Sequence, residues 1–169
     1  MATTNEYTQL SSRVYAASRD NRTGIPANWT ELNWFPDDGV TGFSAGVYRK
    51  GNEIVISYTG TNDKNLDWLF GNVAATGLLP APQVFAAMRL YLDVKRANPG
   101  ASISFTGHSL GGGLASLMSV FFNKPATVFA GAPCQLTAQN PVVLSALQAS
   151  LLLNGYIDLD FSFYNASFG

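Results

Sequence analysis

The stretch Ser104-Phe105-Thr106-Gly107-His108-Ser109-Leu110-Gly111-Gly112-Gly113 decides the fold. Residues 101–106 alternate as a short strand before it, and apolar residues at helical spacing follow it over residues 114–122. The motif at its centre has the form G-x-S-x-G, in which a sharp strand-to-helix turn holds a serine hydroxyl clear of the sheet. The pattern therefore predicts Ser109 as a nucleophile; the alternative is a glycine-rich turn with a purely structural role.

Each residue type in this motif has a physical reason. A serine in such a turn forces the backbone into a sparsely populated region, and side chains two residues away on either side would collide with it. Gly107 and Gly111 are therefore the residues that fit. The following helix directs its unpaired N–H groups and the positive end of its dipole towards the serine. An oxyanion would develop at this place.

Composition limits the function classes. The 169 residues are 47% apolar and only 12% charged, which is about half the charge usual for a soluble protein. We expect a single domain over residues 1–169. Either it exposes apolar surface to lipid, to a partner or to a second copy of itself, or some of its natural covering is absent from this sequence. The net charge of −1 offers no basic field for nucleic acid. One histidine and one cysteine, Cys134, do not make a metal site, so no metal or cofactor is predicted.

The sequence carries neither a secretory signal nor a membrane-spanning segment that we recognise. The N-terminus lacks the basic and apolar regions of a secretory leader, and no apolar run is long enough to cross a membrane. We therefore expect a cytoplasmic protein or one exported without a leader.

The remaining pattern predicts alternating strands and helices. The order of helix, strand, elbow, helix and strand favours parallel pairing, with an antiparallel hairpin at the start of the sheet and residues 53–58 as a central strand. The predicted class is α/β, a mostly parallel sheet with helices on both faces. The predicted segments are a helix capped by Thr3 and Glu6 that reaches about residue 18, a loop over 21–38, strands over 43–49 and 53–58, a helix over 82–98, a strand over 126–130 and a helix from 141 to 155.

The strand over residues 53–58 ends in Thr59-Gly60-Thr61-Asn62. A short glycine-containing turn after a central strand, upstream of the elbow, is where an α/β-hydrolase places a second oxyanion donor. Thr61 offers both a backbone N–H and a hydroxyl for that purpose. The alternative is an ordinary turn that ends the strand.

Over residues 40–135 the chain resembles the class 3 (fungal-type) lipase family. The resemblance is carried by Tyr58-Thr59-Gly60-Thr61, by the Ser109 motif, and by Val128-Phe129-Ala130-Gly131-Ala132-Pro133, in the family's order and spacing. It implies hydrolysis of lipid esters, such as acylglycerols or phospholipids, through an acyl-enzyme on Ser109. It further implies an oxyanion hole formed by Thr61 and the N–H of Leu110.

Two departures from the family concern catalysis. The family usually has an arginine in the place of Thr59. Its triad runs Ser, Asp, His along the chain, but the only histidine here is His108, which precedes the serine and is expected to pack beside the elbow. Asp158 and Asp160 lie where the acid of the triad would fall, and an ordinary surface role is the alternative for both.

Three explanations of the missing base remain open. The chain is the first part of a longer lipase whose Asp and His lie further on, or a scaffold that lost catalysis and binds lipid or a protein, or one half of a site that a second chain completes. A lysine base, such as Lys64, is a less favoured variant.

Overall fold

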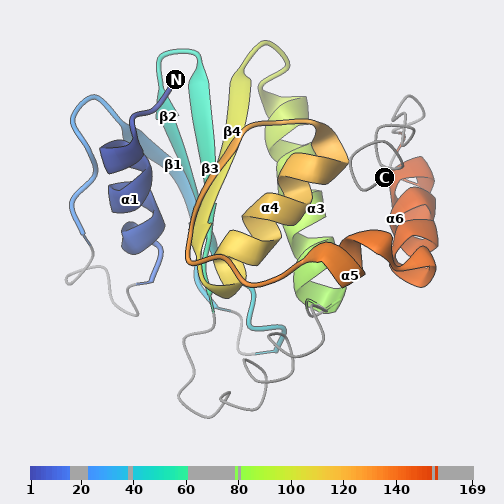
Figure 1. Cartoon of the computed structure of the whole chain (residues 1–169). Coiled ribbons are helices and arrows are strands. Elements are labelled where there is room, and N and C mark those ends of the chain that lie inside the picture. Colours follow the sequence, from blue (N-terminus) through green and yellow to red (C-terminus); the bar gives the residue numbers. More distant parts are fainter. Residues whose placement is uncertain (16–22, 38–39, 61–78, 80, 154, 156–169) are drawn as a thin grey trace.

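A computed structural model describes residues 1–15, 23–37, 40–60, 79, 81–153 and 155. Thr61, Lys64, Asp158 and Asp160 lie outside these described residues. The elements follow in the order α1 (Thr4–Arg13), β1 (Thr30–Phe35), β2 (Ala45–Lys50), β3 (Glu53–Tyr58), α3 (Ala81–Ala97), β4 (Ser102–His108), α4 (Leu110–Phe122), β5 (Ala126–Phe129), α5 (Gln135–Gln139) and α6 (Pro141–Leu153) (Figure 1).

The strands form a mixed sheet whose spatial order, β1-β2-β3-β4-β5, is also their order along the chain. β1, β2 and β3 pair antiparallel, whereas β3, β4 and β5 pair parallel. The predicted α/β class, the hairpin between β2 and β3 and the central place of β3 are confirmed. β3 and β4, which belong to the parallel half of the sheet, both end at its lower edge in Figure 1, where α4 begins. The glycine-rich turn therefore lies at this edge.

β1 corrects one prediction, since residues 21–38 were expected to form a loop. Thr30–Phe35 pairs with β2, and its register shifts between Glu31 and Asn33. Such a bulge breaks the two-residue alternation by which a strand is recognised in sequence. The first helix also differs from its prediction, because α1 ends at Arg13 rather than near residue 18.

Helices cover both faces of the sheet, as predicted, because side chains alternate along the strands. Ile54, Ile56 and Tyr58 of β3 face the core that α3 and α4 cover, whereas Val55 faces α1. α1 begins with the predicted capping box, in which the Glu6 amide donates to Thr3 Oγ1 at 3.3 Å and the Thr3 amide donates to Glu6 Oε2 at 2.8 Å.

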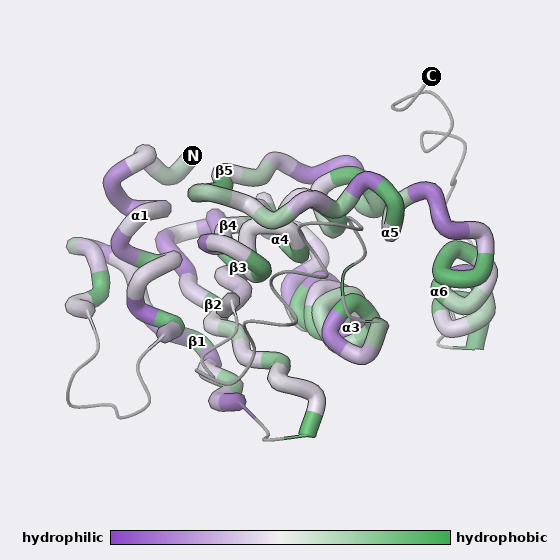
Figure 2. The backbone as a smooth tube through the Cα atoms, turned by 60° about the horizontal axis from the view of Figure 1, so that its bottom comes forward, coloured by the Kyte–Doolittle hydropathy of each residue, from purple (hydrophilic) through white to green (hydrophobic). Residues whose placement is uncertain are grey.

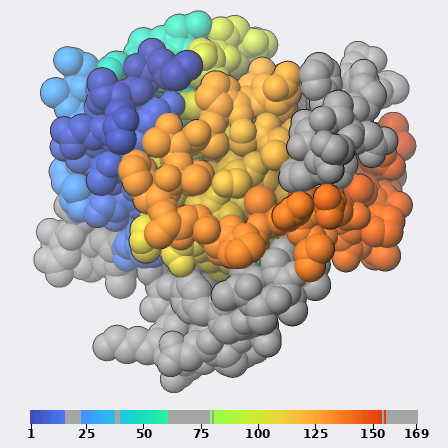
Figure 3. Space-filling model, in the orientation of Figure 1, coloured from blue at the N-terminus to red at the C-terminus, as the bar shows by residue number. Residues whose placement is uncertain are grey.

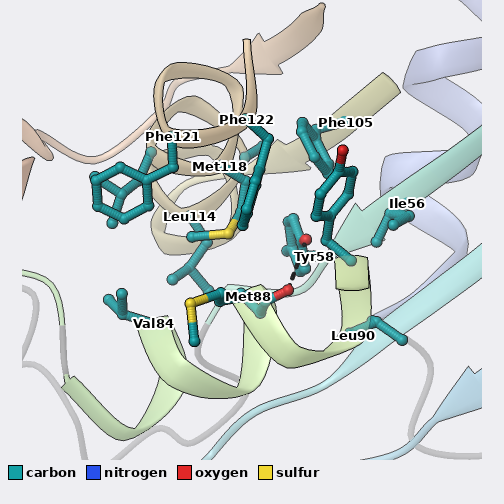
Figure 4. Close-up of a cluster of buried hydrophobic side chains, with 14 of the residues drawn as sticks. Ile56, Tyr58, Val84, Met88, Leu90, Phe105, Leu114, Met118, Phe121 and Phe122 are labelled. Carbon is teal, nitrogen blue, oxygen red and sulfur yellow. Dashed lines mark hydrogen bonds between the residues drawn. The ribbon is translucent and has the colours of Figure 1, made fainter. Parts of the chain in front are cut away.

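Aromatic side chains fill the core between the sheet, α3 and α4 (Figure 4). The rings of Tyr91 and Phe122 stack with centroids 4.1 Å apart, and Tyr91 meets Phe105 edge-on at 5.5 Å. The buried Tyr58 hydroxyl donates to the carbonyl of Ala87 in α3 at 3.2 Å. This packing fixes the end of β3, from which the residues beside the glycine-rich turn extend.

The apolar composition reappears at the surface of α6, which is coloured mostly in hydrophobic shades in Figure 2. Val142, Leu152 and Leu153 are 74%, 60% and 87% exposed. Among the described residues, no helix has both the length and the apolar character that crossing a membrane requires.

A charged cluster fastens α1 to the hairpin. Glu6 accepts hydrogen bonds from Lys50 Nζ at 2.7 Å and from Trp29 Nε1 at 2.8 Å, besides that from the Thr3 amide. The Lys50 bond, the Thr3 amide and the Trp29 bond, in that order, lower the pKa of Glu6 from 4.5 to about 2. The carboxylate form is therefore the one that the fold stabilises.

We expect Glu6→Gln to lower the free energy of unfolding by about 1 kcal/mol at neutral pH, allowing for solvent screening. Because the pKa is lowered in the folded state, this contribution is present above pH 4.5 and fades as the pH falls towards 2. Denaturant unfolding of both proteins across that range measures it. Lys50→Met should show the same pH dependence, and a constant difference at every pH would contradict the assignment.

Candidate active site

Ser109 stands at the junction between β4 and α4 in a strained conformation, with φ 56° and ψ −126°. Positive φ is rare for a residue with a side chain and costs on the order of 1–3 kcal/mol. Backbone hydrogen bonds hold it there. The Ser109 amide donates to the Phe129 carbonyl at 3.1 Å, and the Ser109 carbonyl accepts from the amides of Gly113 at 3.1 Å and Ala132 at 2.9 Å.

The Ser109 side chain makes no capping hydrogen bond, although it occupies the N-cap position of α4. A serine there ordinarily bonds an amide of the first helical turn. The half-buried hydroxyl is therefore not used to end the helix. The backbone of Ser109 is thus fixed, while its hydroxyl makes no capping bond to α4.

Glycines allow α4 to approach the ends of the strands. A Cβ atom on Gly107 would lie 2.3 Å from the Gly111 carbonyl oxygen, and one on Gly111 would lie 2.2 Å from the Tyr58 carbonyl oxygen. Both obstacles are backbone atoms, which cannot turn aside as a flexible side chain would. The turn, the end of β3 and the start of α4 are thus in direct backbone contact.

Leu110, the predicted oxyanion donor, is the first residue of α4 and is buried. The amide of a first helical residue has no acceptor within its helix. The end of β3 lies beside this amide, because a Cβ atom on Gly60 would be 3.5 Å from Leu110 N. The second predicted donor, Thr61, follows Gly60 in the chain and lies outside the described residues.

The side chain of His108 packs against Tyr15. The two rings meet edge-on with centroids 6.1 Å apart, and His108 Nδ1 is 3.5 Å from the Tyr15 hydroxyl oxygen, a long distance for a hydrogen bond. The Tyr15 hydroxyl donates instead to the backbone carbonyl of His108 at 2.8 Å and accepts from the Gly60 amide at 2.8 Å. The exposed imidazole therefore lies beside the junction, next to a tyrosine.

The sequence pattern placed Tyr15 inside the first helix, which was predicted to reach about residue 18, and indicated no role for it at the site. The structure places it just beyond α1, where its hydroxyl bridges the two strand ends. Burial raises the pKa of its phenol, which keeps the hydroxyl protonated as a donor. A tyrosine in a helical stripe looks the same in sequence whether it fills a core or reaches a site, so no signal distinguished it.

Thr59 takes part in a small polar network at the end of the hairpin. Its amide donates to the Ser44 carbonyl at 3.0 Å, its hydroxyl donates to Ser44 Oγ at 3.1 Å, and Ser44 Oγ donates to the Phe35 carbonyl at 2.9 Å. Neutral hydrogen bonds thus anchor the position where the resembled family usually has an arginine.

Other groups considered in the sequence lie elsewhere. The thiol of Cys134, at the start of α5, is partly buried, and this burial raises its pKa, which disfavours the thiolate needed for nucleophilic attack. Within the part of the chain that the structure describes, no group of three or more His, Cys, Asp and Glu side chains could hold a metal ion.

A groove of about 750 Å³ lies between β1, β2 and α3, lined by apolar residues such as Phe35, Phe43, Val47 and Phe85 and by the charged residues Arg89 and Asp93 of α3. Neither Ser109 nor Leu110 lines this groove.

The residues that follow α4 lie next to α1. In Figure 3 they are drawn in orange beside the blue atoms of α1, and Phe129 of β5 packs against the core that α1 covers.

A family model described as a Tle-like phospholipase domain matches residues 6–138, which is most of the chain and includes the whole junction. The chain belongs to the Tle-like phospholipase domains. This domain is 35% identical over 94 residues to an extracellular phospholipase A1 of Serratia liquefaciens, and 47% identical over 53 residues to a putative lipase ATG15 of Kluyveromyces lactis. The matches cover 54% and 31% of the chain but only 28% and 10% of those relatives.

A solved structure shares the fold of this Tle-like phospholipase domain. Lipase II from Rhizopus niveus aligns over 88% of the chain and 69% of its own length, with a TM-score of 0.52 and 18% identity. The expected likeness to fungal-type lipases is thereby confirmed for the fold. The chain spans about a quarter of the length of the phospholipase A1 that it matches.

Proposed function

We propose that this domain belongs to a serine hydrolase of lipid esters, with Ser109 as the nucleophile. The observation that carries the proposal is the strained Ser109 backbone, fixed by three hydrogen bonds while its hydroxyl caps no helix. Strain of this kind persists where surrounding structure imposes it, and it clusters at functional sites. Membership of a family of phospholipase domains supports the same reaction class.

In the proposed reaction, Ser109 Oγ attacks the ester carbonyl carbon while a base removes its proton. The carbonyl oxygen becomes an oxyanion, which the Leu110 amide and the positive end of the α4 dipole stabilise, with Thr61 as the proposed second donor. Return of the proton to the leaving alcohol breaks the ester bond and leaves an acyl-Ser109. Water then hydrolyses this intermediate by the same steps, which releases the fatty acid and restores the serine.

The proposed reaction needs a general base, and this sequence offers no histidine placed to act as one. His108 is the only histidine among the 169 residues, and its ring packs against Tyr15. We propose that the histidine comes from outside this sequence, either from further chain or from a second chain. The acid comes from the same source or is Asp158 or Asp160.

The proposed substrates are phospholipids or acylglycerols. The names of the matched relatives point to this class, and exposed apolar residues on α6 suit contact with a lipid surface.

A fluorophosphonate probe tests the proposal, because it forms a covalent bond with an activated serine. We expect mass spectrometry of the full gene product to place the adduct on Ser109, and Ser109→Ala to abolish both labelling and release of fatty acid from phospholipid vesicles. Ser116→Ala, which changes a serine in the same helix, is the matched control and should keep both. An unlabelled Ser109 in the full product would overturn the proposal.

The position of His108 also favours a second candidate, a lipase-like scaffold that binds lipid or protein without catalysis. It predicts no labelling, together with binding to phospholipid vesicles that Ser109→Ala leaves unchanged. Probe labelling of the wild-type protein and vesicle binding by Ser109→Ala therefore separate the two candidates.

A further inference from the structure

The Tyr15 hydroxyl joins the two strand ends that meet at the proposed site. It accepts a hydrogen bond from the Gly60 amide at 2.8 Å and donates one to the His108 carbonyl at 2.8 Å. The β3–β4 ladder has its last pair at Tyr58 and Gly107, so this phenol links the strands where their own pairing has stopped. A side chain thus takes over the role that a backbone hydrogen bond plays further up the sheet.

The two bonded residues lie next to the proposed reacting groups, since His108 directly precedes Ser109 and a Cβ atom on Gly60 would lie 3.5 Å from Leu110 N. We propose that Tyr15 is a positioning residue, whose hydroxyl holds the end of β3 at a fixed distance from the Leu110 amide and the Ser109 backbone. The inference rests on the proposed function, because it names a further residue of that same site. Tyr15 acts through the backbone and takes no part in proton transfer.

The absence of a side chain at residue 60 supports this role. A Cβ atom on Gly60 would lie 2.5 Å from the Tyr15 hydroxyl oxygen and 3.1 Å from the His108 carbonyl oxygen. Both distances are shorter than ordinary van der Waals contact. The position of the Tyr15 hydroxyl therefore requires glycine at residue 60. A change at either residue should disturb the hydrogen bond between them.

Tyr15→Phe removes the hydroxyl and keeps the ring. We expect the maximal rate of fluorophosphonate inactivation of the full gene product to fall about ten- to a hundredfold, because small misplacement of reacting groups has effects of that size. The probe concentration at half-maximal rate should stay unchanged, since Tyr15 does not bind the probe. Gly60→Ala should reproduce this split by displacing the phenol from the other side.

Tyr7→Phe is the matched control. The Tyr7 hydroxyl donates to Ser104 Oγ at 2.9 Å, so this variant also removes a phenol hydrogen bond to β4, but five residues before Ser109. It should lose stability without a loss of inactivation rate. Equal rate losses in Tyr7→Phe and Tyr15→Phe would show a merely structural role and overturn the inference.

An unreactive Ser109 in the wild-type protein would overturn the proposed function but not the positioning role of Tyr15. A second measurement tests that role independently of reactivity. We expect the Gly60 and Leu110 amide resonances to shift, and Gly60 hydrogen exchange to accelerate, in Tyr15→Phe but not in Tyr7→Phe. Unchanged Gly60 and Leu110 amides in Tyr15→Phe would overturn the positioning role directly.

Discussion

Gly111→Ala is expected to leave this chain unable to fold. The added methyl group would lie 2.2 Å from the Tyr58 carbonyl oxygen and 2.7 Å from the carbonyl carbon of Thr59. Relief would require α4 to move away from β3, which would open the core where Leu114 and Met118 are buried. We estimate a cost of about 4 kcal/mol or more, at the upper end for single substitutions and close to the whole stability of a small domain.

Circular dichroism and denaturant unfolding measure this effect. Gly100→Ala is the matched control, because a Cβ atom there meets nothing within 4 Å and the backbone does not need glycine. It should unfold like the wild type or slightly later. A Gly111→Ala protein with a native spectrum and an unchanged midpoint would show that α4 lies further from β3 than the structure places it.

Ser109→Gly is expected to stabilise the fold while abolishing the proposed reaction. Glycine adopts φ 56° and ψ −126° without the strain that a side chain causes there. Part of the gain is offset by the greater freedom of glycine in the unfolded chain, so we expect the free energy of unfolding to rise by about 1 kcal/mol.

Ser109→Ala separates the two causes. It removes the hydroxyl but keeps a Cβ atom, so it should lose probe labelling without gaining the stability of Ser109→Gly. Thermal and denaturant unfolding of the two variants give the difference directly. If Ser109→Gly were less stable than Ser109→Ala, the serine backbone would not be strained, and the argument for its function would lose its main support.

The parts of the fold that could be predicted from sequence are those with regular local patterns. The run Ile54-Val55-Ile56 indicated a central strand, and the glycines around Ser109 indicated a sharp strand-to-helix turn, because neither pattern depends on distant residues. β1 was missed because its bulge interrupts the alternation. α5 was missed because five residues are too few to show helical spacing.

The candidate site was predictable only in part. Ser109 and Leu110 follow from the motif, which is local. Tyr15 was not predictable, because its bonds to Gly60 and His108 join residues 45 and 93 positions away in the chain. The orientation of the His108 ring depends on its contact with Tyr15, so the sequence predicted only that His108 packs beside the elbow and not which residue it packs against.

The agreement between strand order and chain order has a consequence for synthesis on the ribosome. Each described strand can join its neighbour as it emerges, so the sheet can grow in the direction of translation. The serine backbone, however, is held from downstream, by the carbonyl of Phe129 and the amide of Ala132. A nascent chain that stops before residue 129 contains the whole motif but lacks both of these clamps. The conformation of the Ser109 backbone is therefore completed only after residues 129–132 have been synthesised, later than β3 and β4.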